Sequence, residues 1–231
     1  MDEMNGIRIA PSILAWDLGD LERAVEISVQ GRADQVHLDV IDGHFAPNIT
    51  FGPGTVKALR SRTDLKFDTH LMIENPQAYV DKFLDAGSDI ITFHTEVMNG
   101  SVFDDLQRTV RARGREVGLA VKPETEVPKW ALERLDKVSA LVVMTVNPGF
   151  SGQKLDPAVL PKLQKAREYI EENGLGTDLE VDGGVEPENV QEVVRRGGNV
   201  LVAGAGVYGK KDPVGAVAVL RERAESARRR K

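Results

Sequence analysis

The clearest chemistry in this sequence lies in a stretch that begins at His37 and ends at Asn48. Side chains alternate along a β-strand, so His37 and Asp39 lie on one face and the apolar residues around them lie on the other. An imidazole and a carboxylate two residues apart offer a nitrogen and an oxygen ligand to a divalent metal ion. The Asp-Gly and Pro-Asn pairs that follow are typical of turns. We therefore expect a metal-binding pair at the carboxyl end of a strand.

Other apolar runs end in side chains of the same kind. Asp68 and His70 repeat the two-residue spacing, His94 and then Glu96 follow the next run, and Asp182 ends a later one. A single histidine in a strand is usually an ordinary core or surface residue. Here, however, three of the four histidines lie in three successive runs, and buried carboxylates are costly unless they are paired or bind a cation. We therefore favour a metal site over a polar core.

Three late segments rich in glycine indicate a second kind of site. They are Gly149–Gly152, Gly183–Gly184 and Gly204–Gly206. Glycine lets backbone N–H groups converge on an anion, and phosphate commonly binds at the late loops of (β/α)8 barrels. One such segment would indicate only a tight turn, whereas three in consecutive loops favour a phosphate site. The run Gly204–Gly209 also matches a dinucleotide fingerprint, but no strand is expected after it, so we rank that alternative lowest.

The elements that must position these residues follow from hydrophobic periodicity. Eight apolar, β-prone runs alternate with segments of helical spacing, and parallel neighbours need such crossovers. Because polar residues end many different runs, we favour a closed barrel over an open doubly wound sheet with one switch point. The expected fold is α/β, a single-domain (β/α)8 TIM barrel over residues 1–231. The expected strands are Ile7–Leu14, Gln35–Val40, Leu65–Met72, Asp89–Phe93, Glu116–Val121, Ala140–Val146, Asp178–Val181 and Asn199–Ala203.

The composition narrows the function classes. The 231 residues contain no cysteine, which excludes disulfides and thiolate metal ligands. The formal net charge of −6 argues against nucleic acid as a partner. The apolar runs are too short to cross a membrane, and the first residues lack the basic and apolar regions of a secretory signal. We therefore expect a cytoplasmic protein with no membrane partner.

Taken together, the motifs resemble those of the ribulose-phosphate 3-epimerase family. The likeness covers nearly the whole chain, and the motifs that carry it are His37–Asn48, Asp68–Met72, Val146–Gln153 and Val181–Val185. Their order and spacing are highly specific, although no single motif is. The resemblance implies a phosphate-binding barrel of the ribulose-phosphate type with one divalent metal cation, for which Zn²⁺, Fe²⁺, Mn²⁺ and Co²⁺ are all suitable. It also implies a homo-oligomer, either a dimer or a hexamer.

The resemblance assigns roles to individual positions. The residues that correspond to the family's metal ligands are His37, Asp39, His70 and Asp182, of which Asp39 and Asp182 also correspond to its acid/base pair. The corresponding substrate-binding positions are Ser12, His70, Gly149, Phe150, Ser151, Gly152, Gly183, Gly184, Gly204 and Ala205. Met72 and Met144 correspond to a sulfur-bearing cap over the substrate. The departures from the family pattern are Ile41 for a third cap methionine, Ser151 for a glycine, Ala205 for a serine and Glu124 for a glycine.

The chemistry of the residues supports the same activity. Epimerising a carbon beside a ketone requires a proton to leave one face and another to arrive at the opposite face, which calls for two carboxyl groups. Asp39 and Asp182 come from distant parts of the chain and can face each other across a barrel mouth. We therefore expect a metal-dependent epimerase that interconverts D-ribulose 5-phosphate and D-xylulose 5-phosphate through a metal-stabilised enediolate. The alternatives are a D-allulose 6-phosphate 3-epimerase and, less favoured, a non-catalytic phosphosugar-binding barrel.

Overall fold

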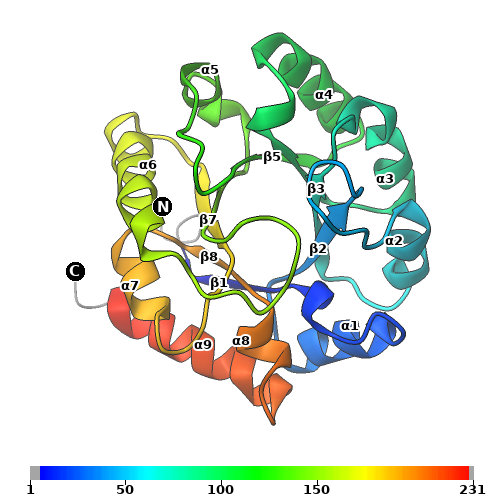
Figure 1. The fold of residues 1–231 in the computed structure, drawn as a ribbon, viewed down its shortest axis with the longest axis vertical. Helices are drawn as coiled ribbons and strands as arrows, with labels where there is room; N and C mark the ends of the chain where they lie inside the picture. The colour runs from blue at the N-terminus through cyan, green and yellow to red at the C-terminus, as the bar shows by residue number, and fades with distance from the viewer. Residues whose placement is uncertain (1–5, 229–231) are drawn as a thin grey trace.

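The protein forms a ring of parallel strands surrounded by helices (Figure 1). The computed structural model describes residues 6–228. Within that range, eight strands form one sheet in the order β1-β8-β7-β6-β5-β4-β3-β2, and a parallel bridge between Ser12 and His37 links the two edge strands. The strands are β1 (Arg8–Pro11), β2 (Gln35–Ile41), β3 (Lys66–Met72), β4 (Ile90–His94), β5 (Glu116–Val121), β6 (Ala140–Met144), β7 (Asp178–Asp182) and β8 (Val200–Ala203). The predicted (β/α)8 barrel is therefore confirmed.

Helices connect successive strands and cover the outside of the ring. They are α1 (Leu21–Gln30), α2 (Pro53–Arg60), α3 (Val80–Ala86), α4 (Gly100–Ala112), α5 (Lys129–Leu132), α6 (Leu160–Glu172), α7 (Val190–Arg195), α8 (Ala205–Tyr208) and α9 (Pro213–Arg228). Side-chain caps fix several of their starts. Asn99 accepts the N–H groups of Ser101 and Val102 at the start of α4, and Asp20 accepts that of Arg23 at the start of α1.

Alternation along the strands separates an apolar outer layer from a partly polar interior. Leu38 and Val40 of β2 belong to the large hydrophobic core between strands and helices. His37 precedes Leu38, and Asp39 lies between Leu38 and Val40; both polar residues are buried but do not belong to that core. Because successive side chains of a strand point to opposite faces, they point into the barrel, as the sequence predicted.

Several element bounds differ from the sequence expectation by one or two residues, and three elements differ more clearly. β1 ends at Pro11 rather than Leu14, because the chain turns there into a 3-10 helix, Ile13–Ala15. Hydrophobic spacing predicts a helix over Val127–Leu135, but α5 covers only Lys129–Leu132. It is shorter because Pro128 precedes it and the N–H of Arg134 bonds only three residues back, to the carbonyl of Ala131. α8 was not expected as a separate helix, and it occupies the dinucleotide-like glycine run after β8. No described strand follows it, as the sequence analysis expected.

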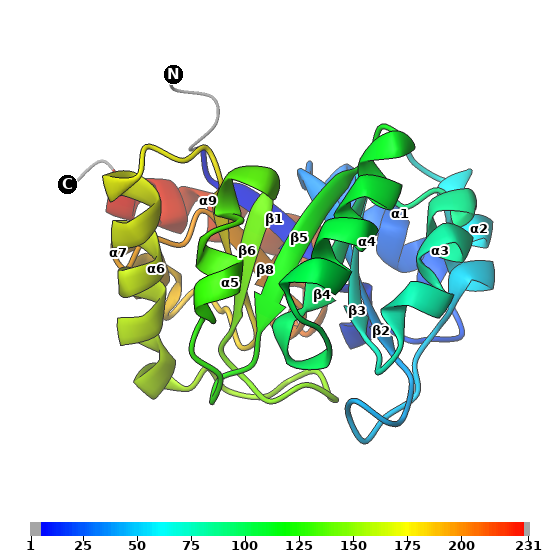
Figure 2. The same ribbon diagram turned by 90° about the horizontal axis from the view of Figure 1, so that it is seen from above.

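Loops at the carboxyl ends of the strands form one face of the barrel. Figure 2 shows the β2–α2 and β6–α6 loops projecting at the same end. Asn48 Nδ2 donates to the carbonyl oxygen of Gly149 over 2.6 Å, which joins these two loops.

None of the helices in residues 6–228 combines the length and the apolar character needed to cross a membrane. The predicted domain bounds, 1–231, stay a prediction, because their ends lie outside the described residues.

Candidate metal centre and active site

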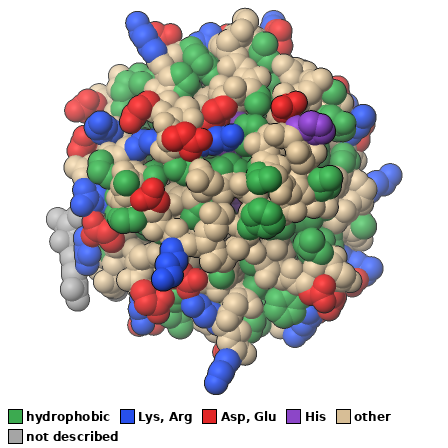
Figure 3. Space-filling view, viewed as in Figure 1, with side chains coloured by type: hydrophobic (Ala, Val, Ile, Leu, Met, Phe, Trp, Pro, Cys, Tyr) green, Lys and Arg blue, Asp and Glu red, His purple; other side chains and the backbone are tan. Residues whose placement is uncertain are grey.

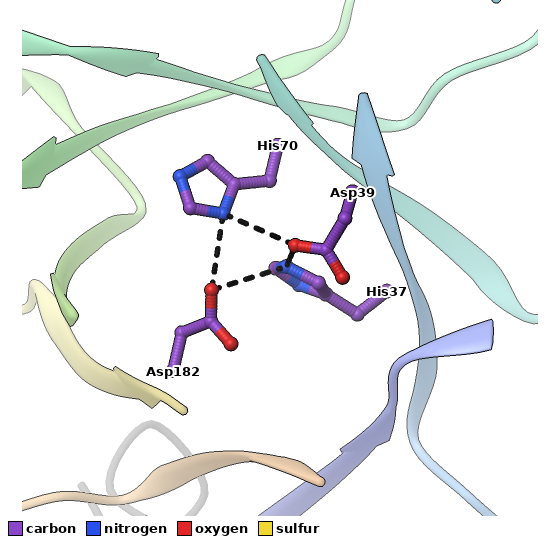
Figure 4. A group of neighbouring side chains, drawn as sticks. All are labelled: His37, Asp39, His70 and Asp182. Atoms are coloured by element: carbon purple, nitrogen blue, oxygen red, sulfur yellow. Dashed lines mark ion pairs between the residues drawn. The ribbon is translucent and has the colours of Figure 1, made fainter. Parts of the chain in front are cut away.

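The four predicted metal ligands lie together on three strands of the barrel (Figure 4). His37 and Asp39 come from β2, His70 from β3 and Asp182 from the end of β7. His70 Nδ1 lies 3.3 Å from Asp182 Oδ2 and 3.8 Å from Asp39 Oδ1. His37 Nε2 lies 3.4 Å from Asp39 Oδ1 and 3.9 Å from Asp182 Oδ2. Two nitrogen and two oxygen atoms therefore face one small space.

The atoms around this space fit a divalent cation. One ligand atom from each of the four residues lies within 4.8 Å of the others. The two facing nitrogens, His37 Nε2 and His70 Nδ1, are buried and have no hydrogen-bond partner. Buried polar atoms without partners are rare because they are costly, and a cation among these atoms would remove that cost. The donor set suits Zn²⁺, Fe²⁺, Mn²⁺ or Co²⁺, so we call these four residues the candidate metal centre.

Burial and charge act in opposite directions on two of its members. Burial raises the pKa of Asp39, but the positive charge of the neighbouring His37 is the main opposing influence, and the pKa falls to about 2. Burial lowers the pKa of His37, yet Asp39 and Asp68 together raise it well above its ordinary value. Asp39 is therefore ionised at neutral pH, whereas His37 is protonated as long as no cation is bound.

A second polar layer lies deeper in the barrel and holds the ring of His37. His37 Nδ1 lies 2.8 Å from Asp68 Oδ2 and 3.3 Å from Glu180 Oε1. Gln35 Nε2 also donates to Asp68 Oδ2, over 3.0 Å. Burial and then the charge of Asp68 raise the pKa of Glu180 to about 8, so this carboxyl is protonated at neutral pH. The layer engages Nδ1 of His37 and leaves Nε2 directed at the candidate metal centre.

The protonated Glu180 predicts a specific pH dependence of stability. Its pKa is about 8 in the folded chain, against an ordinary value of 4.5. Folding therefore retains a proton that the unfolded chain loses, and the free energy of unfolding falls as pH rises between these two values. For one proton the slope is about 1.4 kcal/mol per pH unit. Glu180→Gln, which is neutral throughout, should flatten that slope in urea unfolding of the metal-free protein.

The matched control is Glu124→Gln, at an exposed position of the β5–α5 connection. It should reproduce the slope of the wild-type protein. Parallel stability curves for the wild-type protein and Glu180→Gln would show that Glu180 is ionised in the folded chain.

His94 lies on the other side of His70 from the candidate metal centre. His94 Nε2 is 2.9 Å from His70 Nε2, and His94 Nδ1 is 2.8 Å from Glu96 Oε2. Burial lowers the pKa of His94 to about 4, against the opposing hydrogen bond to Glu96. Burial raises the pKa of Glu96, but its hydrogen bond with His94 helps to lower it to about 2. At neutral pH the pair is therefore a neutral imidazole and a carboxylate.

A cleft opens over the candidate metal centre on the loop face. The predicted substrate-binding residues that line it, together with Asp39 and Asp182, are Ser12, Gly149, Phe150, Ser151, Gly152, Gly183, Gly184, Gly204 and Ala205. His70 is fully buried and is not one of the lining residues. Within the described range no lysine or arginine lines the cleft, and Figure 3 shows mostly uncharged atoms at the centre of this face. A phosphate group here would therefore be held by backbone N–H groups.

The glycines after β7 are required by the backbone. Gly183 and Gly184 have positive φ values of 117° and 63°, and a Cβ on Gly184 would lie 2.2 Å from the backbone nitrogen of Leu155. This close approach holds the loop after β7 against the end of the β6–α6 loop. Ser151, at the position where the sequence resemblance implies a glycine, does not need a left-handed backbone: among residues 6–228 the one non-glycine residue with positive φ is Arg32.

Apolar side chains form one wall of the cleft. Ile41, Met72 and Met144 pack with Ala46 into a small cluster separate from the main core, and the first three line the cleft. This placement is the one that the predicted cap requires of Met72 and Met144. Ile41, at the position where the sequence resemblance implies a third methionine, places another apolar side chain in this wall.

These features place the chain among (β/α)8-barrel enzymes whose site lies at the carboxyl ends of the strands. A family model described as "Ribulose-phosphate 3 epimerase family" matches residues 8–208. Ribulose-phosphate 3-epimerase of Bacillus subtilis (strain 168) is 42% identical over 220 residues, covering 93% of this chain and 98% of that protein. Ribulose-phosphate 3-epimerase of Mycobacterium leprae (strain TN) is 39% identical over 219 residues, covering 95% and 96%. The chain belongs to the ribulose-phosphate 3-epimerase family, which confirms the predicted class of enzyme.

Solved structures share the fold at much lower sequence identity. The crystal structure of KGPDC from Streptococcus mutans is 14% identical, with a TM-score of 0.70, and the match covers 96% of this chain and 98% of that one. At this identity the likeness establishes the barrel fold alone.

Proposed function

We propose that this chain is a metal-dependent epimerase that interconverts D-ribulose 5-phosphate and D-xylulose 5-phosphate. The observation that carries the proposal is that Asp39 of β2 and Asp182 of β7 present their carboxyl groups to one cleft. Inversion at C3, beside the ketone, requires a proton to be removed from one face and another to be delivered to the opposite face. The names of the two relatives, both ribulose-phosphate 3-epimerases, support the same substrate.

In the proposed reaction Asp39 and Asp182 exchange the roles of base and acid with the direction of turnover. Asp39, whose pKa is about 2, begins one direction as the base. Ser12 Oγ donates to Asp39 Oδ2 over 2.5 Å and so orients that carboxylate. Asp182, which holds a proton when the substrate binds in this direction, delivers that proton to the opposite face. In the reverse direction Asp182 starts ionised as the base and Asp39 delivers the proton. A divalent cation in the candidate metal centre would supply Lewis-acid stabilisation of the negative charge that develops on the substrate.

The remaining lining residues suit the two ends of a ketose phosphate. We assign the phosphate to the glycine segments Gly149–Gly152, Gly183–Gly184 and Gly204–Ala205, whose backbone N–H groups can converge on an anion. The apolar wall that contains Met72 and Met144 would lie over the reacting carbons. Unbranched, polarisable methionine side chains adapt to a substrate that changes shape at one carbon, and they keep water from the enediolate.

The direct test is turnover of D-ribulose 5-phosphate, with D-allulose 6-phosphate as the competing substrate. We expect kcat/KM to be higher for the five-carbon substrate by at least about 10-fold, because one added carbon unit displaces the phosphate from its loops. Product formation by NMR and elemental analysis of the same sample provide the measurement. Faster turnover of the six-carbon substrate would establish the alternative epimerase. Tight binding of both substrates with no turnover would establish a binding protein without catalysis.

Three finer assignments belong to the same proposal. We propose one cation per chain, chosen from Zn²⁺, Fe²⁺, Mn²⁺ and Co²⁺, since the donor set accepts each of them. The homo-oligomeric state, a dimer or a hexamer, and the cytoplasmic location stay predictions from the sequence and its family resemblance. The proposed partner is a small ketose phosphate, with neither nucleic acid nor membrane involved.

A further inference from the structure

A chain of hydrogen bonds runs away from the candidate metal centre through residues to which the proposed function gives no role. It links His70 Nε2 to His94 Nε2 over 2.9 Å, and His94 Nδ1 to Glu96 Oε2 over 2.8 Å. His70 and His94 are both fully buried. Their ring planes are nearly parallel, with an angle of 12° between them, and the contact between the two Nε2 atoms is a hydrogen bond in which one ring must donate and the other accept.

We propose that His94 and Glu96 are positioning residues that fix the tautomer of His70. They would keep its Nδ1 free of hydrogen and directed into the candidate metal centre. The inference rests on the proposed function only in taking His70 as a metal ligand.

The direction of each hydrogen bond follows from the carboxylate at the end of the chain. Glu96 Oε1 already accepts the backbone N–H of Lys122 over 2.7 Å. An ionised carboxylate can only accept hydrogen bonds, so His94 Nδ1 must carry the hydrogen that it donates to Glu96 Oε2. A neutral imidazole has one N–H, which leaves His94 Nε2 as an acceptor. The hydrogen between the two rings therefore belongs to His70 Nε2.

This order of hydrogen bonds explains an otherwise costly feature of the site. With its hydrogen on Nε2, His70 presents a bare Nδ1 at 3.3 Å from Asp182 Oδ2, and that nitrogen is buried without a hydrogen-bond partner. Two acceptor atoms at this distance repel each other unless a proton or a metal cation lies between them. The other tautomer would place a hydrogen where the cation must bind. Partners of this kind commonly set the tautomer and affinity of metal-binding histidines.

The surroundings of the pair fit a fixed orientation rather than a mobile one. The ring of Phe45 lies over His94 with the ring centroids 4.5 Å apart. Lys122 Nζ in turn lies 3.9 Å from the centroid of the Phe45 ring. His94 is therefore enclosed between its two hydrogen-bond partners and an aromatic face.

Glu96→Gln distinguishes the proposed positioning role from a merely structural one, because only the positioning role predicts that the tautomer of His70 changes. In this variant the N–H of Lys122 needs the side-chain amide oxygen as its acceptor, so the amide NH₂ group faces His94 Nδ1 and makes that nitrogen an acceptor. The hydrogen of His94 then moves to Nε2, and the hydrogen of His70 moves to Nδ1. Nitrogen NMR of metal-free protein labelled in histidine reports both tautomers directly. We expect His70 Nε2–H and His94 Nδ1–H in the wild-type protein, and the reverse in the variant.

Cobalt(II) titration gives the second readout, which is independent of catalysis. Glu96→Gln should weaken Co²⁺ binding by about 10- to 100-fold, whereas the matched control Glu124→Gln, exposed in the described structure, should bind as the wild-type protein does. An Nδ1–H tautomer of His70 in the wild-type protein, undiminished Co²⁺ affinity in Glu96→Gln, or no Co²⁺ binding by the wild-type protein would each overturn the inference. Wild-type protein with the assigned tautomers that binds Co²⁺ but does not epimerise would instead overturn the proposed function and uphold this inference.

Discussion

Asp39→Asn and Asp182→Asn should each lower kcat for epimerisation by about 10³-fold or more, within the range of an acid/base group. An amide can neither take the C3 proton nor deliver one, and each carboxyl is proposed to serve one face of the substrate. Both side chains are nearly buried, with exposed fractions of 8% and 10%, and asparagine preserves their shape. We therefore expect folded protein, as measured by circular dichroism, with little turnover in either direction.

Exchange of the substrate's C3 hydrogen with solvent deuterium distinguishes a variant that has lost one base from a variant whose whole site is disrupted. In D₂O each variant keeps one of the two carboxylates. The variant should therefore still exchange the C3 hydrogen of one epimer, the epimer whose C3 hydrogen faces the remaining carboxylate. Exchange without inversion, seen by NMR for opposite epimers in the two variants, is the expected signature of two-base chemistry. The matched control is Asp105→Asn on the exposed face of α4, which should retain full activity. Epimerisation near the wild-type rate in either active-site variant would contradict the acid/base assignment.

The fold could be predicted from the sequence because the core and the site both follow the alternation of side chains along each strand. In β2, each apolar residue that packs against the helices is followed by one that points into the barrel. The two-residue spacing of His37 and Asp39 was therefore informative by itself. The parallel register then pairs Asp39 with His70, and β7 brings Asp182 to the same end of the barrel. The closed barrel, which the sequence predicted, brings the four ligands together.

Contacts between strands that are distant in the chain could not be predicted from the sequence. Glu180 shares a face with Asp182, two residues later, so alternation could have indicated that it points inward. That it contacts His37 depends on the closure of the barrel and the stagger of β7 against β2 and β3. The direction of the His70–His94 bond likewise depends on Glu96 turning back to the backbone of Lys122. Spacing along one strand carries no information of this kind.

Removing the metal ion should reduce activity by about 10²-fold or more, because Lewis-acid stabilisation of developing charge is worth several kcal/mol. The experiment is dialysis against a chelator, followed by activity assay, elemental analysis and restoration with each of Zn²⁺, Fe²⁺, Mn²⁺ and Co²⁺. Removal should also lower the melting temperature, since a cation that binds only the folded chain stabilises it. Undiminished activity in protein shown to be free of metal would refute the metal assignment.

The same assay has a matched pair of histidine variants and a predicted pH dependence. His37→Gln should lose metal content and activity together, whereas His44→Gln, in the exposed β2–α2 loop, should lose neither.

Asp39 and Asp68 raise the pKa of His37, so a proton competes with the cation for Nε2 below that raised pKa. Metal affinity should therefore weaken as pH falls, and binding should release protons that calorimetry in buffers of different ionisation enthalpy can count. Because Asp39 is already ionised above about pH 2, a proton released near neutral pH is expected to come from His37 rather than from that carboxylate.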